Sequence, residues 1–194
     1  MQEEKNTPEL EIDFREILLS DYRMACVSRE MSVLGRKEVL TGKAKFGIFG
    51  DGKEVCQLAL AKVVRPGDWR SGYYRDQTFM MARNLINIQQ YFAALYGDTD
   101  LTREPTSGGR QMGGHFATRF LSEDGNWLDQ MADVNSSSDL SPTAAQMPRL
   151  LGLAQASKVY KSLPEMAKKM ANFTDGGNEI AFGMIGDAST SQGL

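Results

Sequence analysis

The sequence predicts an α/β fold in which helices flank a parallel sheet. Ile180–Ile185 is a short, nearly continuous apolar run between a polar turn and Gly186, which is typical of a strand buried on both faces of a parallel sheet. Near the other end, apolar residues recur at mostly three- and four-residue steps from Leu10 to Leu34, as on the buried face of an amphipathic helix. We therefore predict one domain over residues 1–194, with a long N-terminal helical extension at about 9–35.

The composition is that of an ordinary soluble globular protein, and the length allows one sizeable core. Of the 194 residues, 41% are hydrophobic and 24% are charged. The 22 lysines and arginines and the 25 acidic residues give a formal net charge of −3, which offers no attraction to nucleic acid or to an anionic membrane. We therefore predict neither a nucleic-acid nor a membrane role.

The two cysteines, Cys26 and Cys56, show neither metal-binding nor redox spacing, and each lies among apolar neighbours. Small buried side chains are the expected result. Met1–Pro8 is polar and acidic, without the basic start and apolar run of a secretion signal, and no stretch approaches membrane-spanning length. We therefore predict a cytoplasmic location, where thiols stay reduced.

Turn signals and apolar periodicity divide the middle of the chain. A glycine-rich bend is predicted at Gly42–Gly52, and Arg65–Asp68 contains Pro-Gly-Asp, a strong turn signal. The apolar spacing between and after these turns predicts a series of short elements. Helices are predicted at 54–64, 77–82, 88–96 and 161–170, and a short strand is predicted within 69–74. In the first of these helices, the inward residues are expected to be Val55, Leu58, Ala59 and Val63.

Gly97–Leu140 shows no lasting periodicity and is rich in Gly, Ser and Asp. An irregular segment of this length is usually a functional or partner-ordered loop, and disorder in isolation is the alternative. After it, Ser141 is predicted to be the N-cap of a helix with Pro142 in its first turn. The small residues of that helix, with Gly152, favour close packing against another helix or the sheet.

Gly186 and Asp187 end the apolar run, at the place where open α/β sheets bind ligands, outside the carboxyl ends of the strands. A tight turn of small residues lets backbone N–H groups approach an anion, and a carboxylate there suits a hard cation such as Mg²⁺. Asp187 also suits the N-cap of a following helix. The residues alone leave the metal ligand and the cap as equal alternatives.

Gly47–Glu54 nearly matches the phosphate-binding loop G-x-x-x-x-G-K-[ST]. Glu54 stands where that motif has the hydroxyl that binds Mg²⁺, and its carboxylate would face the negative charge of a nucleotide. The preceding Lys43–Phe46 is also a poor candidate for a buried strand. No nucleoside-triphosphate site is therefore predicted here.

Several segments, in order, resemble one family: the α subunits of the decarboxylating component of pyruvate and branched-chain 2-oxo acid dehydrogenases. The resemblance implies a thiamine-diphosphate-binding domain, here incomplete and truncated after the first strand of the metal motif. Each segment alone is weakly specific, but their order and spacing make the match specific. The segments are Arg65–Trp69, Tyr73–Asp76, Gly109–Met112 with His115, Ser141–Pro148 with Gly152, and Gly186–Gly193.

The resemblance implies a role for each matching residue. Tyr74 and Arg75 would contact the diphosphate, through a phenol and a charge-assisted guanidinium; a surface salt bridge is the alternative for Arg75. Ser141 and Thr143 would frame the aminopyrimidine, and Ser141 keeps the helix cap as another role. His115, the only histidine, would be a catalytic residue beside the substrate, since imidazole suits proton transfer near neutral pH. A solvated loop histidine is the alternative.

In the C-terminal motif, the resemblance implies that Asp187 ligates Mg²⁺. Gly186, Ala188 and Ser189 would lie around the diphosphate, the last two through backbone N–H groups. The family has glycine where Ala188 stands, and its motif continues past Leu194 to an asparagine that also ligates the metal. The implied site for thiamine diphosphate and Mg²⁺ is therefore incomplete in this chain.

The complete protein is then expected to be an oxidoreductase that decarboxylates a 2-oxo acid and passes the acyl group to a lipoyl-bearing acyltransferase. A β-type half, separate or fused, would supply the activating glutamate, so we expect a hetero- or homo-oligomer and an inactive fragment. Ile48 stands where pyruvate-type members carry a histidine, and with Gly109–Met112 it favours a branched-chain-like substrate. A non-catalytic assembly module of the same fold and an acetoin-cleaving thiamine enzyme are the alternatives.

Overall fold

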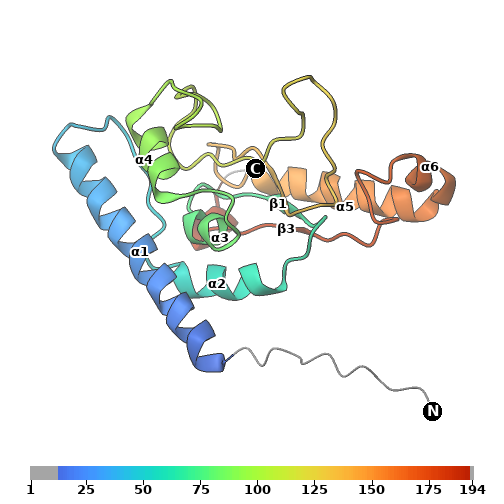
Figure 1. Ribbon diagram of the computed structural model, residues 1–194, viewed down its shortest axis with the longest axis horizontal. Helices are drawn as coiled ribbons and strands as arrows, with labels where there is room; N and C mark the ends of the chain where they lie inside the picture. Colours follow the sequence, from blue (N-terminus) through green and yellow to red (C-terminus); the bar gives the residue numbers. More distant parts are fainter. Residues whose placement is uncertain (1–12, 193–194) are drawn as a thin grey trace, which may run out of the picture.

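A computed structural model describes residues 13–192 and arranges them as helices around a small sheet (Figure 1). Residues 1–12 and 193–194 lie outside the described residues. Some of the sequence-based predictions refer to residues in these two ranges, namely Met1–Pro8, Leu10, Gly193 and Leu194. The elements in chain order are α1 (Phe14–Leu40), α2 (Glu54–Val63), β1 (Trp69–Ser71), α3 (Gln77–Ala82), α4 (Ile88–Tyr96), β2 (Asn135–Ser137), α5 (Gln146–Ser162), α6 (Pro164–Lys169), β3 (Ala181–Phe182) and a 3₁₀ helix (Asp187–Thr190).

The sheet has three parallel strands in the order β2-β1-β3. Arg70 in the central strand is paired with Ser136 on one side and with Phe182 on the other. Because all three strands run the same way, the loops that follow them meet at one edge of the sheet. The predicted α/β fold with a parallel sheet is confirmed. Strand β2 is not predictable from its residues, since Asn-Ser-Ser carries no strand propensity.

The prediction that Ile180–Ile185 is buried on both faces is wrong for the described chain. The paired residues of β3 are only half-buried, and Ile180 and Ile185 are exposed. The reason is topological, because β3 is an edge strand of this sheet. Phe182 and Met184 pack against the core, and the ring of Phe182 lies 5.4 Å from that of Phe79.

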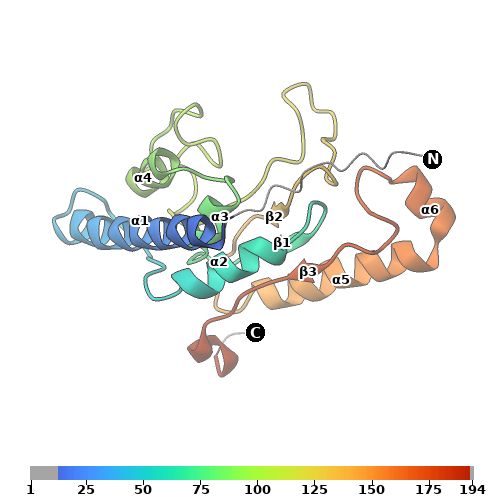
Figure 2. The same cartoon turned by 60° about the horizontal axis from the view of Figure 1, so that its bottom comes forward.

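The hydrophobic core lies between the sheet and the helices α1 to α4. Figure 2 shows α1, α2 and α3 on one side of the strands and α5 and α6 on the other. Phe79 and Met80 of α3 are fully buried, so this short helix is the centre of the core. The other members of the core cluster are Met31, Ala61, Val64, Met81, Ile86, Tyr91, Phe116 and Val134.

Helix α1 ends at Leu40 rather than near residue 35, and its inner face is partly polar. Ser28 and Ser32 are fully buried there, while Cys26 is exposed. Cys56 on α2 is exposed as well, so the prediction of two buried thiols is wrong. The cysteines lie on the outer faces of their helices because polar side chains with hydrogen-bond partners occupy the inner faces.

The inward face of α2 also differs from the apolar pattern. That pattern predicts Val55, Leu58, Ala59 and Val63 as buried, yet of these only Leu58 is. Gln57 is fully buried instead. Its side chain donates to the carbonyl oxygen of Arg75 at 2.9 Å and accepts from the backbone N–H of Phe79 at 3.0 Å. A buried amide with both groups satisfied is tolerated, so the helix is rotated from the predicted orientation.

Gln77 connects α3 to α1 through a buried polar network. Its Nε2 donates to the carbonyl and hydroxyl oxygens of Ser28, at 2.9 and 3.0 Å, and to the hydroxyl of Ser32 at 3.0 Å. Its Oε1 accepts from the N–H of Gly50 at 3.3 Å. Thr78 completes the network, with its hydroxyl 2.7 Å from that of Ser28. These bonds fix the position of α1 along the core.

Helix α5 begins at Gln146, after a turn, and Ser141 does not cap it. The prediction of a helix opening at Ser141 and Pro142 is therefore wrong. Ala144 in that turn has a φ of 61°, a left-handed conformation that a non-glycine residue adopts at some cost. Close packing along α5 is not observed either, because only Gln146 of this helix is buried and Gly152 faces open space.

Within residues 13–192, no helix combines the length and the apolar character needed to cross a bilayer.

The buried network around Gln77 should contribute measurably to stability. Gln77→Leu removes all three donated bonds and leaves the oxygens of Ser28 and Ser32 short of donors. We expect the free energy of unfolding to fall by about 2–3 kcal/mol. The control is Gln89→Leu on the exposed face of α4, which should change it by less than about 0.5 kcal/mol. Urea denaturation measures both, and equally small effects would contradict the assignment.

Candidate functional site

The candidate site lies at the carboxyl ends of the three strands, where segments far apart in the sequence meet. The hydroxyl of Ser71, the last residue of β1, donates to the carbonyl oxygen of Gln146 at 2.8 Å. The side chain of Gln146 then donates to the carbonyl oxygen of Met184 beyond β3, also at 2.8 Å. The start of α5 is therefore attached to the central strand and to the chain after β3. This edge of a parallel sheet is where α/β proteins bind ligands.

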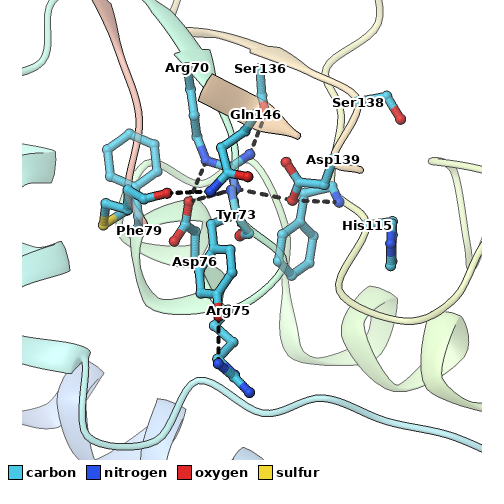
Figure 3. A network of polar contacts seen from close by, with 12 residues as sticks. Arg70, Tyr73, Arg75, Asp76, Phe79, His115, Ser136, Ser138, Asp139 and Gln146 are labelled. Carbon is cyan, nitrogen blue, oxygen red and sulfur yellow. Dashed lines mark hydrogen bonds and ion pairs between the residues drawn. The ribbon is translucent and has the colours of Figure 1, made fainter. Parts of the chain in front are cut away.

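A buried ion-pair cluster of Arg70, Asp76, Asp139 and Ser136, called the Arg70 cluster below, forms the base of the site (Figure 3). The side chain of Arg70 is fully buried and reaches both carboxylates. It donates to Asp76 Oδ2 at 2.8 and 3.0 Å, to Asp139 Oδ2 at 3.0 Å and to the Ser136 hydroxyl at 2.6 Å. A further bond goes to the carbonyl oxygen of Tyr73 at 2.9 Å. One guanidinium thus joins β1, β2 and the two loops that follow them.

Gly72 makes this cluster sterically possible. A Cβ at this position would lie 2.0 Å from Asp139 Oδ1 and 2.1 Å from Arg70 Cζ. The ion pair therefore lies directly against the backbone after β1, in space that any other residue would fill. The second carboxylate oxygens, Oδ1 of Asp76 and of Asp139, are buried without a hydrogen-bond partner among the described residues.

Two carboxylates share one guanidinium in the Arg70 cluster, and burial dominates their protonation. Burial raises the pKa of Asp76 to about 6, although the charge of Arg70 partly offsets the effect. The pKa of Asp139 is raised as well, again by burial first and against the attraction of Arg70. Taking a carboxylate out of water disfavours its charged form, and one cation cannot fully compensate two anions.

The Arg70 cluster holds the segment that contains Tyr73, Tyr74 and Arg75. The guanidinium of Arg75 donates to the hydroxyl oxygen of Tyr73 and lies 5.6 and 5.5 Å from the ring centroids of Tyr73 and Tyr74. Burial raises the pKa of Tyr73 to about 12, so its hydroxyl stays protonated at neutral pH. Among residues 13–192, Arg75 pairs with no carboxylate, so the surface salt bridge is not observed.

His115 is buried beside the same segment, with 7% of its surface exposed, rather than solvated. Its Nε2 lies 2.7 Å from the hydroxyl of Ser141, and its Nδ1 lies 3.0 Å from the carbonyl oxygen of Met112. The imidazole stacks on Tyr74 with the ring centroids 6.1 Å apart. His115, Ser141 and Tyr74 are therefore contiguous, which no spacing in the sequence reveals.

The irregular loop that carries His115 is held by its own side chains and glycines. The carboxylate of Glu104 accepts four hydrogen bonds from residues 106–109 of this loop, at 2.7 to 3.0 Å. Burial opposes its charge, but these bonds outweigh burial and lower the pKa of Glu104. Gly114 has a φ of 85°, and a Cβ there would lie 2.7 Å from the carbonyl oxygen of Tyr74. The loop thus packs directly on the Tyr74 backbone.

The turn after β3 approaches the same place. A Cβ on Gly186 would lie 3.2 Å from the Tyr73 hydroxyl oxygen, so a glycine suits this approach. Asp187 is exposed, and its carboxylate accepts the backbone N–H of Ala188 at 2.8 Å. The N–H of Ser189 donates to the carbonyl oxygen of Gly186 at 3.0 Å. Within residues 13–192, no group of three or more His, Cys, Asp or Glu side chains is placed to hold a metal.

The structure brings some of the predicted site residues together and leaves others apart. Tyr74, Arg75, His115, Ser141 and Gly186 form one continuous group through the contacts given above. Thr143, Ala188 and Asp187 are exposed nearby, without a side-chain bond to that group. Nothing in the sequence pattern indicates Tyr73 as a hydrogen-bond partner of Arg75, or Arg70, Asp76 and Asp139 as a cluster.

In Gly47–Glu54, the segment that nearly matches the phosphate-binding loop, the glutamate itself binds the backbone. The N–H of Gly52 donates to both carboxylate oxygens of Glu54, at 3.1 and 3.0 Å. Arg29 of α1 forms a salt bridge with the same carboxylate at 2.8 Å. A phosphate would meet a carboxylate here rather than free N–H groups, which agrees with the absence of a predicted nucleotide site.

The Arg70 cluster should make stability depend on pH. Because the pKa of Asp76 is about 6 in the folded chain against 3.8 when unperturbed, the folded chain holds a proton that the unfolded chain releases between these values. Lowering the pH from about 7 to about 5 should raise the free energy of unfolding by about 1 kcal/mol. This stabilisation is complete below the unperturbed pKa of 3.8, and it is lost as the pH rises through the folded-state pKa of about 6.

Denaturation of the 194-residue chain at several pH values tests this dependence. Asp76→Asn keeps the shape of the side chain but cannot ionise, so its stability should change less over the same interval. A wild-type stability that falls steadily as the pH is lowered through this interval would contradict the prediction.

Comparisons with known proteins agree with the family expected from the sequence segments. Residues 22–194 match the family model described as "Dehydrogenase E1 component". The chain is also 29% identical, over 149 residues, to the 2-oxoisovalerate dehydrogenase subunit alpha of Bacillus subtilis (strain 168). That alignment covers 73% of this chain and 40% of the relative, so the chain spans well under half the length of the curated relative it matches. The family model matches most of the chain and includes every segment that forms the candidate site. The chain therefore belongs to the dehydrogenase E1 component family.

Proposed function

We propose that this chain carries the diphosphate-binding and Mg²⁺-binding part of a thiamine-diphosphate-dependent 2-oxo acid dehydrogenase. The observation that carries the proposal is the position of Arg75. Its guanidinium has no carboxylate partner among the described residues, donates to the Tyr73 hydroxyl and lies at the sheet edge approached by Gly186. A cation held by aromatic rings beside a glycine turn is suited to an anionic ligand.

The residues present fit the diphosphate of such a cofactor. Arg75 offers a planar set of donors, and Tyr74 adds a neutral phenol on a half-buried side chain. The backbone N–H groups of Ala188 and Ser189 are engaged within their own turn, so binding through them would require that turn to open. The Tyr73 hydroxyl, fixed in the protonated form, orients the guanidinium.

For Mg²⁺, the described residues supply only part of a coordination shell. Asp187 is exposed next to Gly186, and one carboxylate together with phosphate oxygens and water is a usual Mg²⁺ environment. The single carboxylate supports our proposal that the metal site is completed by residues outside the described chain. The 194-residue chain would therefore be inactive alone.

At the other end of the site, we assign the aminopyrimidine side to Ser141 and Thr143. Ser141 forms a hydrogen bond with His115. Tyr74 connects this pair to Arg75, because its ring stacks on His115 and lies close to the guanidinium of Arg75. The imidazole is placed to move a proton between its Nε2 and the Ser141 hydroxyl. When bound, thiamine diphosphate would supply the chemistry that decarboxylates a 2-oxo acid, while these residues bind and orient it.

The complete protein would act with a β-type half and a lipoyl-bearing acyltransferase, as a hetero- or homo-oligomer. The matched relative is named for 2-oxoisovalerate, and Ile48 together with Gly109–Met112 also favours a branched 2-oxo acid as the substrate. The two cysteines are free, which fits our proposal of a reducing, cytoplasmic setting.

Arg75 should dominate the binding of the diphosphate. We expect Arg75→Ala to weaken binding of thiamine diphosphate, and of inorganic diphosphate, by about tenfold or more, because a charge-assisted donor is lost. Calorimetry with Mg²⁺ present measures both ligands. The control is Arg119→Ala, which removes the same charge from an exposed loop position and should leave binding unchanged. Absence of binding to the wild type, or equal effects of the two variants, would contradict the proposal.

Asp187 should couple Mg²⁺ to the diphosphate. In the wild type, adding Mg²⁺ should strengthen binding of thiamine diphosphate, and in Asp187→Ala this gain should largely disappear. The matched variant is Asp175→Ala in the exposed turn before β3, which should keep the gain. If Asp187→Ala retained the full Mg²⁺ dependence, or left the complete enzyme fully active, the metal assignment would be wrong.

A further inference from the structure

We infer that Arg70, together with Asp76 and Asp139, is a positioning device that fixes the Tyr73–Arg75 segment and the segment before Ser141 as one unit for the diphosphate. This inference rests on the proposed function and extends it to residues that do not touch the cofactor. Its basis is the fully buried guanidinium at the carboxyl end of β1, whose bonds reach both segments.

The first segment is held on both sides of Tyr73. Arg70 Nη2 donates to the carbonyl oxygen of Tyr73 at 2.9 Å, and the N–H of Tyr73 donates to Asp76 Oδ2 at 3.0 Å. The N–H of Asp76 also returns to the Tyr73 carbonyl at 2.9 Å. With both peptide groups fixed, the phenol of Tyr73 has a defined direction, and it is the acceptor that orients Arg75.

The second segment is held by the other carboxylate. Asp139 Oδ2 accepts from Arg70 at 3.0 Å and from the backbone N–H of Phe116 at 3.2 Å. The N–H of Asp139 donates to the carbonyl oxygen of Phe116 at 3.0 Å. Phe116 follows His115 and Asp139 precedes Ser141 by two residues, so the same guanidinium also fixes the His115–Ser141 pair.

A buried ion cluster of this kind is poorly explained by stability alone. Replacing buried ion pairs by well-packed apolar residues is often neutral or stabilising, and this cluster leaves two carboxylate oxygens unpartnered. Arginine can reach two carboxylates, a hydroxyl and a carbonyl at once because its planar group carries five donors. Gly72 is part of the device, since a Cβ there would displace the guanidinium.

Two variants perturb the cluster in different ways. Asp139→Asn keeps an acceptor but removes one negative charge, and Gly72→Ala keeps every charge but pushes into the Arg70–Asp139 pair. The matched control is Asp68→Asn at the amino end of the same strand. Asp68 is also buried, accepts from Arg65 and from the N–H of Ile180, and lies away from the Tyr73–Arg75 segment.

Backbone hydrogen exchange in the 194-residue chain separates positioning from general stability. We expect Asp139→Asn and Gly72→Ala to speed exchange at residues 72–76 and 138–142 while exchange in α4 stays at the wild-type rate. In the same variants, calorimetry with inorganic diphosphate and Mg²⁺ should show binding weakened by about tenfold. Asp68→Asn should change neither the exchange rates at residues 72–76 and 138–142 nor the affinity for diphosphate.

Each result decides a different point. Wild-type exchange at 72–76 in both variants, or faster exchange spread equally over α4, would overturn the positioning role. If Arg75→Ala weakens diphosphate binding while Asp139→Asn and Gly72→Ala do not, the proposed function stands and this inference fails. If Arg75→Ala leaves binding unchanged but the local exchange effects appear, the cluster holds the segments and the proposed function fails.

Discussion

The burial of one guanidinium at the carboxyl end of β1 is the constraint on which the rest of the candidate site depends. A fully buried Arg70 is tolerated only where anions and acceptors surround it. Asp76 comes from the adjacent loop, whereas Ser136 and Asp139 lie more than sixty residues along the chain. Their convergence forces the loops after β1 and β2 together, and Gly72 leaves room for the contact.

Two regions of different character meet at the Arg70 cluster, a hydrophobic core and a polar edge of the sheet. Below the strands, the core around Phe79 and Met80 excludes water, and satisfied amides of Gln57 and Gln77 fix its helices. At the carboxyl edge the side chains are polar or charged, and Arg75 has no carboxylate partner among residues 13–192, which supports our proposal that it binds an anion. Helix α5 is largely exposed and β3 is only half-buried, which is in keeping with a chain that spans 40% of its matched relative and with our proposal that other parts of the protein complete the site.

Several features were predictable because their causes are local. Short helices such as Gln77–Ala82 and Ile88–Tyr96 follow from apolar spacing between turn signals, and the structure has them at those bounds. The buried face of α2 was not predictable, because Gln57 is inside only by virtue of partners on another loop. The same holds for Asp139 and Arg70, whose isolated sequence contexts resemble those of surface charges, and for the stacking of His115 on Tyr74.

The sequence by itself determined the α/β class, the parallel strand before Gly186 and the membership of the dehydrogenase E1 component family. Periodicity, turn chemistry and ordered motifs are all properties of neighbouring residues, so a linear pattern is sufficient for them. Only the tertiary structure decided that Tyr73 orients Arg75, that Ser141 bonds His115 instead of capping a helix, and that Arg70 links the loops. Those outcomes depend on which partners the fold brings within reach of each polar group, and a fully buried group such as Arg70 must be satisfied by them.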